Sequence, residues 1–183
     1  MQPLSAYGLE TKFHQFDATL TLGDDHVIEG YASLFGATDQ SGDVVEKGAY
    51  AKSLGAGRRV KMLWQHDPRE PIGIWDEVRE DAHGLYVKGR LLESVTRARE
   101  AAALTKAGAI DGLSIGYRTV KSHKNERGLR CLSEVELWEV SLVTFPMLPE
   151  ARLDAHEGKS GGLHDLAQVF ENARRNLAAR KAR

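Results

Sequence analysis

Apolar and polar residues alternate along much of this chain, and a period of two is typical of β-strands. Strands are predicted over residues 16–22, 27–35, 60–66, 72–78, 85–92, 113–121 and 129–145. Helix-forming residues dominate 94–107, where Ser94 is the expected N-cap and Gly108 the stop, and a shorter helix is predicted at 49–54. The pattern predicts a mainly β (α+β) fold, a closed or curled antiparallel β-barrel flanked by helices.

Glycine, proline and polar residues mark the predicted breaks between these elements. Residues 23–25 are expected to form a tight turn, 36–48 a loop, and Asp67-Pro68 and 81–84 two further turns.

The composition changes near the C-terminus. Residues 1–153 are expected to form one domain, 154–162 a flexible linker and 163–183 a basic helical tail. From Lys159 onward there are six Lys or Arg residues and two acidic residues, which gives this end a charge of +4. A basic helix could dock on an acidic partner, and the alternative is a solvated helix.

Overall charge and cysteine content exclude several classes of function. The net charge of −1 provides no basic field of the kind that nucleic-acid binding needs. A single cysteine, Cys131, excludes an intramolecular disulfide framework and a multi-cysteine zinc site, and it fits a reducing cytoplasm. No apolar run approaches the ~20 residues of a membrane span, so we expect no membrane partner.

His66 ends an apolar row. Alternate residues of a strand share a face, so Val60, Met62, Trp64 and His66 point to one side of the predicted strand. A histidine at the edge of such a row is partly desolvated, which suits a general base. The alternative is a core-edge histidine bonded to a backbone carbonyl.

Glu139 interrupts a second apolar row, which it shares with Val135, Leu137, Ser141 and Val143. Burying an unpaired carboxylate is costly, so Glu139 should have a hydrogen-bonding partner, and a histidine N–H is a suitable one. The alternative is a structural ion pair with a lysine or arginine.

Ser114 lies on the same strand face as Gly112 and Gly116. Glycines on both sides allow another backbone to approach, as an extended peptide substrate would require. The alternative is a glycine-rich strand bent for packing. The G-x-S-x-G spacing also matches a nucleophile elbow, but an elbow needs a helix after the serine, whereas residues 116–121 continue as strand.

Eight short motifs follow one another along most of residues 13–153. They are 30–35 (GYASLF), Asp39, 42–43 (GD), 48–50 (GAY), 62–67 (MLWQHD), 71–73 (PIG), 112–117 (GLSIGY) and 139–146 (EVSLVTFP). In this order they resemble the prohead (capsid-maturation) serine proteases of tailed phages, a family that also occurs in phage-derived gene transfer agents. That family looks related to herpesvirus assemblins, which are β-barrels wrapped by helices, in agreement with the predicted fold.

The resemblance implies that His66 is the general base, Ser114 the nucleophile and an acidic residue the third member. Glu139 is favoured for the third position by its place in an apolar row, with Asp111 and His123 as the alternatives. Assemblins use a second histidine there. The oxyanion donors are not assigned, because Pro146, in the segment where the related enzymes have theirs, has no N–H.

A serine endopeptidase of this family would cleave the scaffolding segment of the major capsid protein, or a separate scaffold, and the chain itself. The resemblance also implies a homodimer, and it implies action inside the assembling procapsid in the bacterial cytoplasm. We expect no cofactor, metal or nucleic acid in this chemistry.

Three rival readings come from other classes of protein. The first is a catalytically inactive β-barrel that acts as a scaffold or capsid-assembly chaperone. The second, a metal-dependent hydrolase using His66, Asp67 and His83, is disfavoured because the chain has no H-E-x-x-H or comparable spacing. The third, a cysteine hydrolase using Cys131, lacks an adjacent activating group.

Overall fold

The computed structural model describes residues 10–14, 21–22, 26–39 and 41–144. In these residues the order of elements is β1 (Glu10–His14), β2 (Thr21–Leu22), β3 (Val27–Leu34), β4 (Asp43–Val45), α1 (Ala51–Gly55), β5 (Lys61–Trp64), β6 (Asp67–Glu80), β7 (Gly84–Leu91), α2 (Thr96–Lys106), β8 (Gly112–Lys124) and β9 (Arg130–Val143). The expected mainly β fold with few helices is confirmed. None of the described helices is long and apolar enough to cross a membrane.

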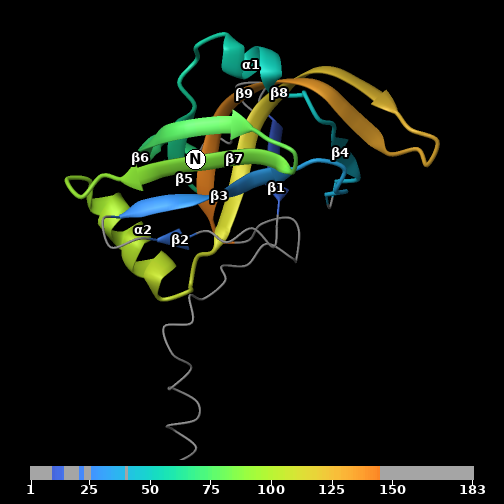
Figure 1. Cartoon of the computed structure of the whole chain (residues 1–183). Helices are drawn as coiled ribbons and strands as arrows, with labels where there is room; N and C mark the ends of the chain where they lie inside the picture. Colours follow the sequence, from blue (N-terminus) through green and yellow to red (C-terminus); the bar gives the residue numbers. More distant parts are fainter. Residues whose placement is uncertain (1–9, 15–20, 23–25, 40, 145–183) are drawn as a thin grey trace, which may run out of the picture.

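All of these strands belong to one curled sheet, in the order β1-β8-β9-β5-β6-β7-β3-β2, with β4 paired to the start of β9. In Figure 1 strands β6, β7 and β3 cross in front of β8 and β9, and the far end of the β8–β9 hairpin projects from the body. The core lies between these two parts of the sheet. The sheet was predicted to be antiparallel throughout. It is mixed instead, because β9 pairs in parallel with both β4 and β5.

Some elements differ from the prediction. β1 and β4 were not expected, and β4 lies within the predicted loop at 36–48. Ser94 is not the N-cap of α2: Val95 occupies that position and makes no side-chain capping bond. Gly108 does end the helix as predicted, with φ of +70° and its N–H donated to the carbonyl of Thr105.

The predictions for the linker and tail at 154–183, the turn at 23–25 and most of the strand at 16–22 fall outside the described residues.

The turn between β5 and β6 is not at Asp67-Pro68, where it was predicted. Trp64 pairs with Asp67, which leaves Gln65 and His66 as a two-residue hairpin turn with φ of +52° and +60°. Strand β6 continues through its prolines because it pairs with β7 only from Gly73 onward. Proline is tolerated on such an unpaired edge.

The apolar row predicted for β9 is buried in the structure, and Val140 and Leu142 on the other face are buried as well. Val135, Leu137, Glu139, Ser141 and Val143 are all buried, as is the apolar first half of β8. The second half of β8 is largely exposed, because the hairpin leaves the body of the protein there.

Strand β8 allows a matched test of this division. We expect Ile115→Ala to lower the free energy of unfolding by about 2–4 kcal/mol, since Ile115 is fully buried and its truncation leaves a cavity. Val120→Ala on the exposed half of the strand should change it by less than about 0.5 kcal/mol. Equilibrium denaturation in urea measures both values, and equal losses would contradict the described packing.

Asp67 gives a pH-dependent contribution to stability. Hydrogen bonds from the side chain and backbone N–H of Arg69 lower the pKa of Asp67 from its ordinary 3.8 to about 2. A lowered folded-state pKa stabilises the fold above the unfolded pKa, and this contribution is lost as the pH falls from about 4 to 2. Asp67→Asn should therefore destabilise the protein at pH 5 and have a smaller effect near pH 2. Ser122→Ala, at an exposed position, removes no ionisable group and should show no such trend. Urea denaturation at the two pH values measures the difference.

Candidate active site

The register of the β8–β9 hairpin brings three of the relevant positions together. Ser114 lies opposite Ser141, and Gly116 lies opposite Glu139. Directly opposed residues of an antiparallel pair share a face, as do residues two apart along one strand. Ser114, Glu139 and Ser141 therefore project from the same face of the hairpin, although 25 residues separate Ser114 from Glu139 in the sequence.

The β5–β6 turn places His66 over this face. Strand β5 runs parallel to β9, and the backbone N–H of Gln65 donates to the carbonyl of Leu142 at 2.9 Å. The side chain of Gln65 donates to Thr144 Oγ1 at 2.6 Å. Left-handed φ angles at two consecutive non-glycine residues cost free energy, and they persist only where surrounding contacts fix them. Here these contacts anchor the turn to the end of β9.

His66 bridges Ser114 and Glu139. Its Nε2 lies 2.6 Å from Ser114 Oγ, and its Nδ1 lies 2.5 Å from Glu139 Oε1. With the proton on Nδ1, the ring donates to the carboxylate and Nε2 accepts the serine hydroxyl proton. The exposed fractions are 8% for His66, 2% for Glu139 and 0% for Ser114. This buried arrangement can activate a hydroxyl for nucleophilic attack.

Ser141 is a site residue to which sequence reasoning gave no role. Its Oγ donates to Glu139 Oε2 at 2.6 Å and accepts the backbone N–H of His66 at 3.2 Å. It therefore satisfies the second carboxylate oxygen and connects the histidine turn to β9. Its position two residues after Glu139, in the same apolar row of the strand, could have indicated that the two side chains lie close together.

Gly116 has a different role from the one expected. A Cβ at this position would lie 2.8 Å from the carboxyl carbon of Glu139, which is closer than real Cβ contacts. The space above Gly116 is occupied by the Glu139 carboxylate, not left open for a substrate backbone. The absence of a side chain at Gly116 is thus what allows the acid to lie alongside β8.

The two alternatives for the third member lie elsewhere. Glu139 occupies the position next to Nδ1 of His66, so neither Asp111 nor His123 fills it. Asp111 precedes β8, and His123 lies near the far end of β8, where its Nε2 faces Glu46.

The residues considered for a metal-dependent hydrolase do not converge. The ring of His66 is used by Ser114 and Glu139, while Asp67 pairs with Arg69. His83 lies in the turn between β6 and β7, with its ring against Tyr31. Cys131 is buried on β9, near the opposite end of the strand from Glu139.

Comparisons with known proteins identify the family of this chain. A family model described as caudovirus prohead serine protease matches residues 14–162. The prohead protease of Enterobacteria phage HK97 is 33% identical over 151 residues, which cover 76% of this chain and 64% of the HK97 protein. A capsid polyprotein of Pseudomonas phage PAJU2 is 35% identical over 139 residues, 71% of this chain and 20% of the polyprotein.

A solved structure supports the fold independently. The capsid assembly protease of bacteriophage T4 superposes with a TM-score of 0.62 at 16% identity, covering 74% of this chain and 97% of that chain. The expected curled sheet with few helices is therefore shared with a capsid protease. Because the family match extends over residues 14–162, it takes in His66, Ser114 and Glu139 with nearly all of the sheet, and this chain belongs to the caudovirus prohead serine protease family.

Proposed function

We propose that this chain is a serine endopeptidase that cleaves capsid or scaffold protein segments while a phage-like procapsid matures. The hydrogen-bonded line from Ser114 through His66 to Glu139 carries the proposal. Membership of the prohead protease family supports it, as do the names of the HK97 and T4 proteins. This chain spans 64% of the length of the HK97 protein.

In the proposed mechanism Ser114 Oγ attacks the scissile carbonyl carbon, and Nε2 of His66 accepts the hydroxyl proton. The tetrahedral intermediate collapses to an acyl-enzyme as His66 gives that proton to the leaving amine. A water molecule then attacks the acyl group by the same route and releases Ser114. Glu139 stabilises the imidazolium in both steps and keeps the Nδ1–H tautomer in place.

Two further residues would position this machinery without touching the substrate. Ser141 donates to the oxygen of Glu139 that His66 does not contact, so the carboxylate cannot rotate freely. Gly116 provides the space that Glu139 occupies. Preorganisation of this kind matters because small displacements of a reacting group reduce rates steeply.

Cleavage of the chain itself is part of the proposal. A segment similar to this chain occurs within the PAJU2 capsid polyprotein, so a relative is joined to a longer capsid chain. A protease joined to its substrate is positioned to cut the connection between them. The homodimer implied by the resemblance, and action inside the procapsid, stay predictions.

The alternative is an inactive β-barrel that acts as a scaffold or assembly chaperone. The side chains of His66, Glu139, Ser114 and Ser141 are all buried, and replacing buried polar pairs by apolar residues of similar volume is often neutral or stabilising. A purely structural protein gains little from this arrangement. The burial of all four side chains therefore favours the enzyme.

Replacing the nucleophile tests the proposal directly. Co-expression of the chain with its cognate capsid or scaffold protein should give shortened products, measured by intact-mass spectrometry. Ser114→Ala should slow this cleavage and any self-cleavage by at least about 10⁴-fold, the scale seen when a triad nucleophile is removed. Ser122→Ala, on the exposed half of β8, is the matched control and should cleave like the parent.

The same comparison separates the rivals. If product masses are the same with Ser114→Ala as with the parent chain, the serine mechanism is wrong. Cleavage that stops on addition of a chelator, with Ser114→Ala still active beforehand, would support a metal-dependent hydrolase instead.

Gly116→Ala tests the positioning of the acid. The added Cβ would displace the Glu139 carboxylate, so we expect kcat to fall by about 10²-fold with little change in KM. Glu139→Asp shortens the acid, and combined with Gly116→Ala it should lose less activity than the product of the two single losses. Steady-state kinetics on a peptide spanning a mapped cleavage site measures the cycle. Strictly multiplicative losses, or a change confined to KM, would contradict the role given to Gly116.

A further inference from the structure

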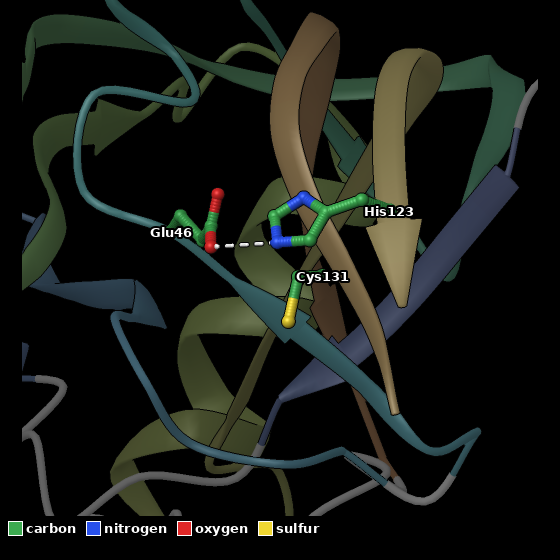
Figure 2. A group of neighbouring side chains, drawn as sticks. All are labelled: Glu46, His123 and Cys131. Atoms are coloured by element: carbon green, nitrogen blue, oxygen red, sulfur yellow. Dashed lines mark ion pairs between the residues drawn. The ribbon is translucent and has the colours of Figure 1, made fainter. Parts of the chain in front are cut away.

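Three side chains with different metal-binding chemistry gather far from the Ser114 site. One ligand atom each from Glu46, His123 and Cys131 lies within 4.8 Å of the other two. Figure 2 shows the carboxylate of Glu46 facing the imidazole of His123, with the side chain of Cys131 below them. Among the described residues this is the group whose donors are close enough to share one metal ion.

The backbone fixes the positions of these residues. His123 on β8 is the direct partner of Cys131 on β9, and Val44 on β4 is the parallel partner of Cys131 on the other side. The backbone N–H of Glu46 donates to the carbonyl of Leu132 at 3.0 Å. Three neighbouring chain segments therefore present the donors from backbone that is already paired.

The donors interact only weakly with one another. His123 Nε2 and Glu46 Oε1 are 3.5 Å apart, which is long for a strong hydrogen bond. The Cys131 thiol donates a long hydrogen bond to the carbonyl of Leu129, at 4.0 Å. Cys131 is 5% exposed, whereas His123 and Glu46 lie at the surface. The cluster thus has a buried sulfur and an open solvent side.

We infer that Glu46, His123 and Cys131 form a binding site for one Zn²⁺ ion. Zinc takes thiolate, imidazole and carboxylate ligands in tetrahedral geometry, with bonds of about 2.0–2.3 Å. Two ligand atoms on such a tetrahedron are about 3.3–3.7 Å apart, a range that includes the observed separation of His123 and Glu46. A water molecule on the open side completes the coordination.

The ligand set also selects the metal. Mg²⁺ and Ca²⁺ prefer oxygen ligands, and this group offers one carboxylate beside a nitrogen and a sulfur. A thiolate with an imidazole favours zinc, and Co²⁺ is a spectroscopic substitute of the same geometry. A two-cysteine site is not needed, because histidine and glutamate supply the remaining protein ligands.

The proposed ion lies apart from the site of peptide cleavage. His123 follows Ser114 by nine residues on one strand, a separation of about 30 Å along β8. A bound ion would fix the projecting end of the β8–β9 hairpin to the segment that follows β4. The inference does not depend on the proposed protease activity.

Metal titration of the full chain tests the site. The Ser114→Ala variant is used because it cannot cleave itself through the proposed nucleophile. We expect this variant, with its cysteine reduced, to bind one equivalent of Zn²⁺ in competition with a chromophoric chelator. It should also unfold at a higher temperature with Zn²⁺ than with Mg²⁺. Co²⁺ should give the intense tetrahedral d–d bands together with a near-ultraviolet band from thiolate-to-metal charge transfer.

Variants show whether these three residues are the ligands. Cys131→Ser and His123→Ala should each weaken Zn²⁺ binding by about 100-fold or more, and Glu46→Gln by at least about tenfold. His83→Ala, a histidine in the β6–β7 turn, is the matched control and should bind like the parent. Because the His123 side chain is 54% exposed, its variant should fold even if Cys131→Ser does not.

Three outcomes would overturn the inference. They are the absence of one-equivalent Zn²⁺ binding, a Co²⁺ complex without the thiolate band, and Zn²⁺ affinity that is unchanged in His123→Ala.

Discussion

A carboxyl group buried inside the sheet is the constraint on which the arrangement of Ser114, His66 and Glu139 depends. The Glu139 carboxylate is 2% exposed, and an ion in that position is tolerated only if its oxygens are satisfied. His66 satisfies one oxygen and Ser141 the other. Gly116 leaves the space into which the group fits. The orientation of the histidine, and hence its reach to Ser114, follows from the hydrogen bond that it makes to this one carboxylate.

The contacts of the Glu139 carboxylate depend on how β8 and β9 pair. Their register opposes Ser114 to Ser141 and Gly116 to Glu139. A slip of one residue would turn one strand's side chains to the opposite face and separate the acid from the serine. The parallel pairing of β5 with β9 fixes the histidine turn against the same strand. The long pairing of β8 with β9 therefore stabilises the sheet, and it also sets the distances among Ser114, His66 and Glu139.

The strand face on which a residue lies was predictable from the sequence, because alternate residues of a strand share a face. The place of Glu139 in a buried apolar row and the shared face of Ser114, Gly112 and Gly116 required only a period of two. The turn at Gln65 and His66 was not predictable in this way, because its left-handed angles occur without the glycine or asparagine that usually signals them.

Features that depend on pairing between distant segments could not be predicted from the local sequence pattern either. The parallel strand β4 is too short to show a period, and the role of Ser141 depends on which residue the sheet brings opposite it. Glu46, His123 and Cys131 have no motif spacing, so only three-strand register brings them together. Sequence pattern therefore predicts faces well, and it predicts neighbours across the sheet poorly.

The complete burial of Ser114 affects when the molecule can act. A hydroxyl with no accessible surface cannot meet a peptide carbonyl while the resting packing persists. Under the proposed mechanism, attack by Ser114 therefore requires an opening motion that uncovers the hydroxyl, and the population of opened molecules limits the rate together with the chemistry. The packing around this one oxygen atom would then set how often the serine can react.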